Sequence, residues 1–414
     1  MIIGRYADRN GSDTSIRRLV RLLTGALLVS AVVAVGPPSA SADFRLRPSA
    51  AEPAIDVFRG VAATSPADAW IVGISSASET SRAHTLIAHW NGRTWQRVPS
   101  PDAPGRRTSS FLNAVAATSR RDAWAVGESN SGGGSTLIER WNGKAWKVTP
   151  SPSVRRHFNF LSAVAATSRN DAWAVGWVLT GPGSGTQTLI EHWNGTAWLA
   201  VPSPNVSKRD QNILNGVTVI SPSDVWAVGD YFAGSKPPQT LIEHWNGTNW
   251  AIVPSTNPLG ATSPDHLNGV SAVSPGDIFA VGDLGDVFAP TSTMILRWKG
   301  SSWKQVASPS SDTADESLLA VSAVSASDAW AVGSFSSQTS SESPPLILRW
   351  NGAKWRAVRT PVPHGSISND LTSVAAISAK SAWAVGSTQG GPRQGPLLLR
   401  WNGARWTVVA VSFR

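Results

Sequence analysis

The sequence predicts an all-β protein, a seven-bladed β-propeller made of four-stranded antiparallel blades. A tryptophan followed by Asn-Gly, or once by Lys-Gly, recurs seven times at intervals of 51 to 53 residues, and each has a second tryptophan five residues later. An Asp-x-Trp-x-Val-Gly segment precedes each copy by about 20 residues, with Phe279 replacing the tryptophan once and Ser381 replacing the aspartate once. A period near 50 is typical of propeller blades or of solenoids. A solenoid would need polar caps and a shorter repeat, which favours the propeller.

The second repeat shows why each unit is predicted to hold four strands. Residues 111–118 form a small-residue apolar strand suited to the crowded innermost position, residues 119–122 form a turn, and residues 123–126 form the next strand. A Gly/Ser loop leads to a strand at 136–141 and, after Asn-Gly, to a strand at 146–149. Asn-Gly is a strong signal for a two-residue hairpin turn. In the first repeat this turn would place Trp90 opposite Arg93.

Residues 1–42 are predicted to be an export signal. Five arginines precede an apolar run at residues 22–35, and small residues at Ala40 and Ala42 fit a cleavage site. The run is short for a membrane span, so cleavage is favoured over a retained anchor. The protein is therefore expected to be secreted through the Sec route, with a twin-arginine route through Arg17-Arg18 as the alternative.

The remainder divides into an N-terminal linker, residues 43–55, and the propeller, residues 56–412. The blades are expected at about 56–105, 106–156, 157–209, 210–262, 263–314, 315–365 and 366–412.

Composition excludes several classes of function. The chain has no cysteine, so disulfide frameworks, zinc ribbons and thiol nucleophiles are excluded. Without the signal, 31 basic and 25 acidic residues leave a net charge of +6, spread along the chain rather than concentrated as nucleic-acid binding requires. The seven histidines do not have metal-ligand spacing. We therefore expect no cofactor, no metal, no nucleic-acid partner, no membrane contact after cleavage, and a monomer.

Polar residues that recur in every repeat are expected to be structural. A serine and, three residues later, an aspartate suit a turn in which both side chains accept backbone hydrogen bonds. A cation precedes each Asn-Gly tryptophan and is expected to pair with the turn aspartate or with an indole face. The tryptophans are expected to pack between blades.

The candidate binding site lies in the segments that differ between repeats. Loops between the second and third strands and between blades should share one face, and variable loops on a rigid scaffold are the usual place for binding. Neighbouring blades carry cations and aromatic rings there, a combination suited to glycans. The candidate ligand-binding residues are Arg106, Arg107, Arg155, Arg156, His157, Trp177, Lys208, Arg209, Tyr231 and Phe232. The alternative is that Trp177 covers an adjacent loop and the cations are merely solvated.

The repeat resembles that of a known group of proteins. Leu-x-Ala-Val-x-Ala, Asp-Ala-Trp-Ala-Val-Gly and Trp-Asn-Gly-x-x-Trp are similar to the repeats of secreted actinobacterial propellers, over residues 56–412. They are distantly similar to photosystem II assembly-factor propellers and to sialidase-type BNR repeats. The Asp-box of sialidases is not intact, and no arginine triad with a tyrosine nucleophile is found. The resemblance implies the fold and export.

The leading hypothesis is a secreted module that binds cell-envelope or extracellular polysaccharide through its variable face, without catalysis. The alternatives are a scaffold for an exported protein, which predicts a broad apolar patch on that face, and a propeller-type glycoside hydrolase or lyase. An enzyme would need two converging carboxyls in a deep central pocket. Glu139, Glu191 and Glu243 share one strand position in separate blades and are not expected to converge. No catalytic residue is assigned.

Overall fold

A computed structural model describes residues 55–411, except 79, 106, 131–132, 155–156, 182–184, 261, 286–288, 338–342 and 391–394. The predicted export signal lies outside the described residues. These residues contain no helix that could cross a membrane. Their strands form seven antiparallel sheets of four strands each, in which every strand pairs with its neighbours in the chain. The predicted all-β, seven-bladed propeller is confirmed.

Each blade is one uninterrupted stretch of chain. The first four blades comprise β1 (Ile55–Ser65), β2 (Asp68–Ser76), β3 (His84–Trp90) and β4 (Trp95–Arg97); β5 (Ser110–Ser119), β6 (Asp122–Ser129), β7 (Ser135–Trp141) and β8 (Trp146–Val148); β9 (Phe158–Ser168), β10 (Asp171–Leu179), β11 (Thr186–Trp193) and β12 (Trp198–Ala200); and β13 (Asn212–Ser221), β14 (Asp224–Tyr231), β15 (Gln239–Trp245) and β16 (Trp250–Ile252).

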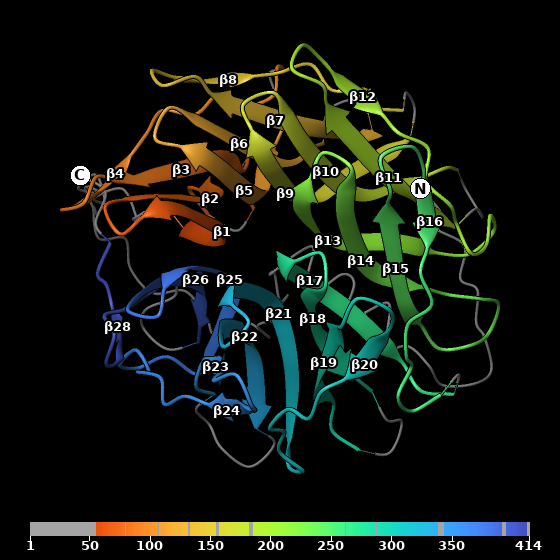
Figure 1. Cartoon of the computed structure of the whole chain (residues 1–414). Coiled ribbons are helices and arrows are strands. Elements are labelled where there is room, and N and C mark those ends of the chain that lie inside the picture. Colours follow the sequence, from red (N-terminus) through yellow and green to blue (C-terminus); the bar gives the residue numbers. More distant parts are fainter. Residues whose placement is uncertain are drawn as a thin grey trace, which may run out of the picture. The chain divides into compact units, whose positions relative to one another are not determined.

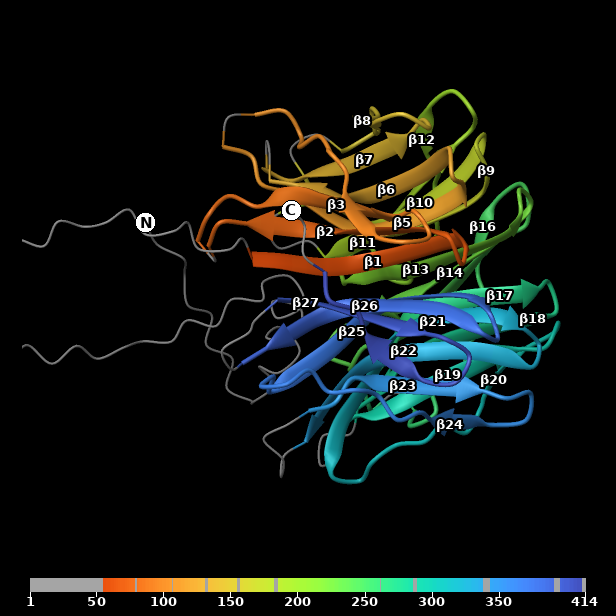
Figure 2. The same cartoon turned by 90° about the vertical axis from the view of Figure 1, so that its left-hand side faces the viewer.

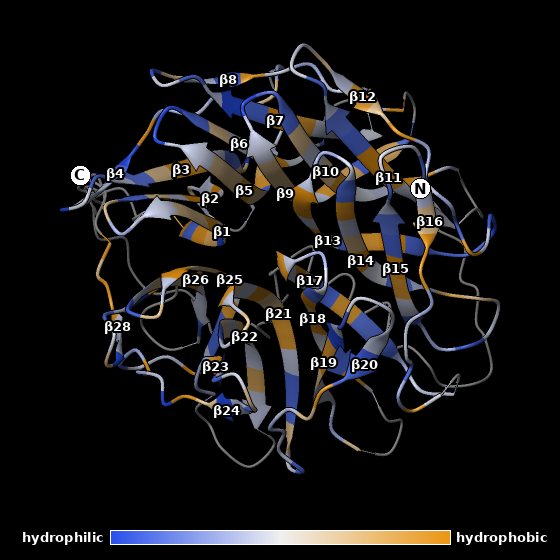
Figure 3. Cartoon of the chain, viewed as in Figure 1, coloured by the Kyte–Doolittle hydropathy of each residue, from blue (hydrophilic) through white to orange (hydrophobic). Residues whose placement is uncertain are grey.

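The last three blades comprise β17 (Asp265–Ser274), β18 (Asp277–Leu284), β19 (Ser292–Trp298) and β20 (Trp303–Gln305); β21 (Ala314–Ser325), β22 (Asp328–Ser337), β23 (Leu346–Trp350) and β24 (Trp355–Ala357); and β25 (Ser368–Ser378), β26 (Ser381–Gln389), β27 (Gly395–Trp401) and β28 (Trp406–Val408). The first strand of each blade lies nearest the axis and the short fourth strand lies at the rim (Figure 1). Apolar and polar residues alternate along many strands (Figure 3).

The ring closes by contact between the first and last blades. Each innermost strand contacts the next one, and β25 contacts β1. At this seam the backbone N–H of Val61 donates to the Ser373 hydroxyl at 3.2 Å, and Thr372 Oγ1 donates to the carbonyl of Arg59 at 3.0 Å. Val409 and Val411 pack on the core between the two blades. No strand is shared across this seam.

A glycine after each Trp-x-Val segment lets the second strand continue past a bulge. The first and second strands of a blade shift register beside this glycine, as between Val175 and Gly176 in blade 3. A Cβ on Gly176 would lie 1.9 Å from the carbonyl oxygen of Phe160, so only glycine fits. The second strand continues beyond this glycine, so β6 ends at Ser129 rather than at the predicted residue 126, and β10 ends at Leu179.

The Asn-Gly turns differ from the two-residue hairpin that the sequence predicts. Trp90 pairs with Trp95 rather than with Arg93, so four residues form the connection. The side-chain oxygen of Asn91 accepts hydrogen bonds from the backbone N–H groups of Arg93 and Thr94, at 2.9 and 3.0 Å. Asparagine therefore acts as the cap of a longer turn, with Gly92 at a φ of 94°.

The recurring polar residues are structural, as predicted. His89 Nε2 lies 2.7 Å from Asp68 Oδ1 and its ring lies 4.1 Å from that of Trp70. In blade 5 the Arg297 guanidinium bonds Asp277 and lies 4.5 Å from the ring centre of Phe279. Although burial opposes it, hydrogen bonding to His89 lowers the pKa of Asp68. The turn serine accepts a backbone N–H as predicted, whereas the aspartate side chain accepts from the cation instead.

The repeat tryptophans pack between blades, as predicted. Trp124 of blade 2 contacts Trp193 and Trp198 of blade 3, at ring separations of 4.9 and 5.1 Å. The indole N–H of each Asn-Gly tryptophan donates to a carbonyl of the serine–aspartate turn in its own blade, as Trp193 does to Arg169 at 3.2 Å. These contacts join adjacent blades and hold each turn.

Candidate functional site

The variable loops share one face of the ring. Strands run between this variable-loop face and the opposite face, where the serine–aspartate and Asn-Gly turns lie (Figure 2). The loop after the second strand of a blade is hydrogen-bonded to the point where the next blade begins. For example, the backbone N–H of Ser110, the first residue of β5, donates to the Ala83 carbonyl at 3.0 Å. The variable-loop face is therefore a connected surface supported by a regular sheet.

Four contacts hold the loops of blades 3 and 4 on this face, and the one between Gly185 and Arg209 links a loop of blade 3 to the loop that leads into blade 4. The Leu179 carbonyl lies 3.1 Å from His157 Nδ1, and the backbone N–H of Gly185 donates to the Arg209 carbonyl at 3.0 Å. The backbone N–H of Phe232 donates to the Gln211 carbonyl at 2.8 Å. Asp210 completes the set by accepting the N–H of Gly234 at 3.1 Å.

Asp210 also accepts the Ser207 hydroxyl, and these hydrogen bonds lower its pKa, so the carboxylate that joins the two loops is ionised at neutral pH. Asp210 was not among the sequence candidates, because its importance depends on which loop lies beside it.

Six of the predicted site residues lie on the loops and strand ends of blades 3 and 4. We name His157, Trp177, Lys208, Arg209, Tyr231 and Phe232 the blade 3–4 patch. Lys208 and Arg209 are exposed, and Tyr231 and Phe232 are half-buried. Exposed Arg107 lies on the loop one blade away, at residues 98–109. Arg106, Arg155 and Arg156 lie outside the described residues.

Trp177 and Tyr231 do not open a loop, contrary to the sequence prediction. Trp177 lies within β10, pairs with Phe160 of β9 and is only 9% exposed. Its ring stacks on Phe158 and Phe160, at 5.5 and 5.3 Å between ring centres. Tyr231 is the last residue of β14 and packs on the core between blades 3 and 4. Both strands continue past the repeat glycine, where the sequence pattern ends, because they pair with a neighbouring strand on each side.

Polar groups of several blades also lie along the innermost strands. Asn113 donates to Glu128 at 2.6 Å and accepts from Arg59 at 2.5 Å. Burial raises the pKa of Glu128 to about 7, while Arg59 and Asn113 oppose the shift. On the other side of the ring, Asn215 and Asn268 bond Asp230 and Asp283, at 3.2 and 3.3 Å. Each of these three carboxylates is thus held by an asparagine of its own blade.

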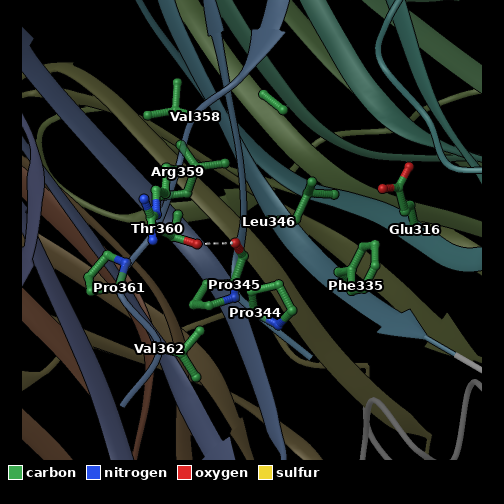
Figure 4. A pocket seen from close by; sticks show the side chains of 12 residues that line it. Glu316, Phe335, Pro344, Pro345, Leu346, Val358, Arg359, Thr360, Pro361 and Val362 are labelled. Atoms are coloured by element: carbon green, nitrogen blue, oxygen red, sulfur yellow. Dashed lines mark hydrogen bonds between the residues drawn. The ribbon is translucent and has the colours of Figure 1, made fainter. Parts of the chain in front are cut away.

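A cavity of about 670 Å³ lies at blade 6, away from the blade 3–4 patch (Figure 4). Pro344, Pro345, Leu346 and Phe335 form much of its wall, and Thr360 donates to the Pro345 carbonyl at 2.9 Å. Among the described residues that line the cavity, Glu316 is the one with a carboxyl group, and it accepts a hydrogen bond from the backbone N–H of Ser311. The cavity therefore does not supply the carboxyl pair that glycoside hydrolysis requires.

Asp312 and Asp315, near the start of β21, have separate surroundings, and metal ligands do not gather among the described residues. Asp312 is exposed on the loop before β21, while the neighbouring Asp315 accepts hydrogen bonds from the backbone and hydroxyl of Thr291. No group of three or more histidine, cysteine, aspartate or glutamate side chains in the described part of the chain could hold a metal ion.

The fold and its loop-bearing face define the class, a seven-bladed β-propeller. No protein-family model and no curated protein matches the chain. Among solved structures it is similar to YCF48 bound to a D1 peptide, with 12% identity and a TM-score of 0.51 over 84% of this chain and 94% of the other. This likeness agrees with the photosystem II assembly-factor resemblance of the repeats.

Two further structures show the same fold. An ulvan lyase, a polysaccharide lyase, is 10% identical with a TM-score of 0.53, over 86% of this chain and 97% of its own. A xyloglucanase from Xanthomonas campestris is 12% identical with a TM-score of 0.52, over 85% of this chain and 54% of its own. At these identities the likeness shows the fold alone.

Proposed function

We propose that the protein is an exported binding protein without catalytic activity, and that its blade 3–4 patch recognises an anionic polysaccharide of the cell envelope or surroundings. The observation that supports this proposal is the fixed arrangement of exposed Lys208 and Arg209 beside the half-buried rings of Tyr231 and Phe232. Guanidinium and ammonium groups bind carboxylate and sulfate oxygens, and aromatic rings stack on sugar faces.

The buried position of Trp177 changes how the patch would work. Because Trp177 stacks on Phe158 and Phe160, it supports the strands beneath the loops rather than offering a free ring. Recognition would then depend on the cations, with Tyr231 and Phe232 as the half-buried rings beside them. Binding should therefore be sensitive to salt, because exposed charge interactions are screened over about 10 Å at 0.1 M salt.

A protein partner is the second candidate. Val154, Leu179 and Val206 are 42%, 39% and 43% exposed on the loops and strand end around the patch. Exposed aliphatic groups of this kind suit a protein surface or a peptide better than a sugar. The structure of YCF48 with a D1 peptide shows that a propeller of this fold can hold a peptide.

The test is binding of the purified protein to a panel of anionic and neutral polysaccharides and cell-wall fractions, at low and high salt. Replacing Lys208 and Arg209 together by alanine should weaken binding to the anionic polymers about tenfold or more, since each charged hydrogen bond contributes about 1.5–3 kcal/mol. A matched control replaces Lys354 and Arg405, two exposed cations of the opposite face, by alanine.

Equal loss in the two double variants would mean that net charge, not the patch, governs binding. Failure of every polysaccharide to bind would leave the protein partner as the candidate. That partner should then be sensitive to Leu179→Asp, which places a charge among the exposed aliphatic groups.

A further inference from the structure

A hollow of about 390 Å³ lies between blades 2 and 3, on the face that carries the serine–aspartate and Asn-Gly turns. Exposed Arg121 and Arg169, one from each blade, lie in its wall. Their guanidinium groups have neither a hydrogen-bond nor an ion-pair partner among the described residues. Two like charges beside one hollow repel each other, and an anion bound between them would remove this cost.

The carboxylate beside Arg169 is already bonded by another cation. At the equivalent place between blades 1 and 2, Arg120 reaches Asp68 of the preceding blade at 3.5 Å. In blade 2 the strand cation is Arg140, whose Nε and Nη2 donate to Asp122 Oδ1 at 3.1 and 2.9 Å, while a threonine hydroxyl donates to the other oxygen. Both oxygens of Asp122 are therefore occupied, and Arg169 is left without a carboxylate.

Other hydrogen-bond donors line the same hollow. Ser119 Oγ accepts the backbone N–H of Arg121 at 3.3 Å, and Ser168 Oγ accepts that of Asn170 at 3.2 Å, so each serine keeps its own hydroxyl proton for another acceptor. The side-chain oxygen of Asn142 accepts two backbone N–H groups of its turn, and its NH₂ group has no acceptor within the described residues. Both blades thus offer donors to a bound anion.

The arginine pair occurs at one of the seven blade interfaces. Each interface brings together the third residue of one serine–aspartate turn and the second residue of the next, and between blades 2 and 3 both are arginine. At the other six interfaces these positions hold Ala67 and Arg120, Asn170 and Pro222, Ser223 and Pro275, Gly276 and Ala326, Ser327 and Ala379, and Lys380 and Pro66. Because six interfaces form without two cations, the fold does not require the pair.

The interface between blades 6 and 7 has the same framework without the arginines. Arg349 Nε donates to Asp328 at 2.9 Å and its Nη2 donates to the Ala379 carbonyl at 3.2 Å, the bonds that the strand arginine of blade 2 also makes. Serines again open both turns. Ser327 and Ala379 stand where blades 2 and 3 have arginine, so this interface is an internal control for the pair.

A phosphate monoester group suits this set of donors. It carries a charge of about −1.5 to −2 at pH 7 and three acceptor oxygens, which matches two free guanidinium groups from two blades. A carboxylate or a sulfate ester carries one negative charge and would leave one guanidinium unpaired. Arginine binds phosphate oxygens through paired N–H groups, and the serine hydroxyls could bond the remaining oxygen.

We propose that this hollow is a phosphate-binding site in which Arg121 and Arg169 hold one phosphate monoester group between two blades. Exposed Arg93 and Lys144, on the same face of blades 1 and 2, add positive charge that attracts anions toward it. The site lies on the opposite face from the blade 3–4 patch and does not depend on the proposed function. Phosphorylated polymers and lipid headgroups share this chemistry, and the test separates them.

NMR titration of the whole protein with inorganic phosphate tests the site directly. The backbone N–H signals of Ser119 and Ser168 should shift together and saturate, whereas acetate at equal ionic strength should leave them nearly unchanged. Replacing Arg121 and Arg169 by alanine should weaken the affinity about tenfold or more for each arginine. The matched control replaces Lys354 and Lys380, two exposed cations of the same face, by alanine and should keep the affinity.

A gain of binding can be tested between blades 6 and 7. Ser327→Arg together with Ala379→Arg should create a second phosphate site there, seen as saturable shifts of the Ser325 and Ser378 backbone N–H signals. Failure to gain this site would contradict the assignment of binding to the arginine pair. Equal weakening in the lysine control, or equal shifts with acetate and phosphate, would overturn the site, because unspecific attraction of anions would then explain the shifts.

The source of the phosphate group is identified with two larger probes. One is sedimentation with phosphatidylcholine vesicles that contain phosphatidic acid, and the other is binding to phosphorylated dextran. Binding to one probe that is lost in the Arg121→Ala and Arg169→Ala variant supports the site and identifies a lipid or a polymer. Binding to neither probe would contradict it. Polysaccharide binding that depends on Lys208 and Arg209 is measured separately, so either proposal can fail alone.

Discussion

Replacing Asp277 by serine would give blade 5 the arrangement that blade 7 already has. In blade 5 Arg297 donates to both carboxylate oxygens of Asp277, at 2.6 and 2.7 Å, with both side chains about nine-tenths buried. In blade 7 Ser381 occupies the position of this aspartate, and Arg400 lies over the rings of Trp90 and Trp383, 5.4 and 5.1 Å from their centres. Comparing the two blades therefore separates the contribution of the ion pair to stability from that of the ring contacts.

The expected loss of stability depends on the interactions that Arg297 keeps after the substitution. Removing one partner of a buried ion pair typically costs about 3–5 kcal/mol. Arg297 would retain the ring contacts with Phe279 and Trp350 and its 3.2 Å hydrogen bond to the Ala326 carbonyl. We therefore expect Asp277→Ser to cost about 3 kcal/mol, the lower end. For a domain of this size that is a fall in Tm of roughly 4 °C.

Differential scanning calorimetry at several pH values measures this effect. Hydrogen bonding to Arg297 lowers the pKa of Asp277 against the opposing effect of burial. A carboxyl with a lowered pKa stabilises the fold above its unfolded pKa and loses that contribution as the pH falls. The Tm difference between the two proteins should therefore be full near neutral pH and shrink below about pH 4.

The reverse substitution completes the test. Ser381→Asp should supply Arg400 with the missing partner and raise stability by about 1 kcal/mol, less than the loss in blade 5 because a buried charge must be desolvated. An unchanged Tm for Asp277→Ser would refute the reasoning, since the ring contacts alone would then account for the stability of the arginine.

Three further predictions concern other features of the fold. Gly229→Ala places a Cβ 1.9 Å from the Ile213 carbonyl oxygen and should cost about 3 kcal/mol or more, whereas Gly276→Ala meets no atom within 4 Å and should be nearly neutral in urea unfolding. Trp173→Phe should cost about 1 kcal/mol and Trp173→Ala about 4 kcal/mol, because Phe279 fills the same position in blade 5; equal losses would show that the indole itself is required. Because burial raises the pKa of Glu243 to about 8, the folded state keeps this proton at pH values at which the unfolded state has lost it. The free energy of unfolding should therefore fall by about 4 kcal/mol from about pH 5 to about pH 9, and Glu243→Gln should reduce this pH dependence in thermal unfolding.

The fold could be predicted from the sequence because seven copies report the same pattern. One Asp-x-Trp-x-Val-Gly segment is weak evidence, but its recurrence at a nearly constant interval fixes the number of blades. The local geometry of the turns was harder to predict. The Asn-Gly pair predicts a two-residue turn, yet the Asn91 side chain caps a four-residue connection, and that choice depends on a hydrogen bond rather than on residue preference.

The positions of the candidate site residues in the fold could be predicted only in part. Charge and aromatic content identify the variable-loop face and the loops around blades 3 and 4. They do not show that the strand continues past Gly176 and buries Trp177, because this depends on pairing with β9 and β11 elsewhere in the blade. They also do not show that Asp210 joins the loop 201–211 to Gly234, a contact across 24 residues.

The seam between β1 and β25 has a consequence for how this chain could be rearranged. Since each blade is self-contained and no strand crosses between the first and last blades, every gap between blades is topologically equivalent to this one. A circular permutant opened within residues 306–313, with a linker joining Val411 to Ile55, would retain all seven sheets. Insertion of a duplicated blade would need one cut in a loop and loss of a blade would need two, in both cases with no exchange of strands. The ring is thus a series of topologically equivalent blades, and side-chain packing and a few hydrogen bonds close it at the seam.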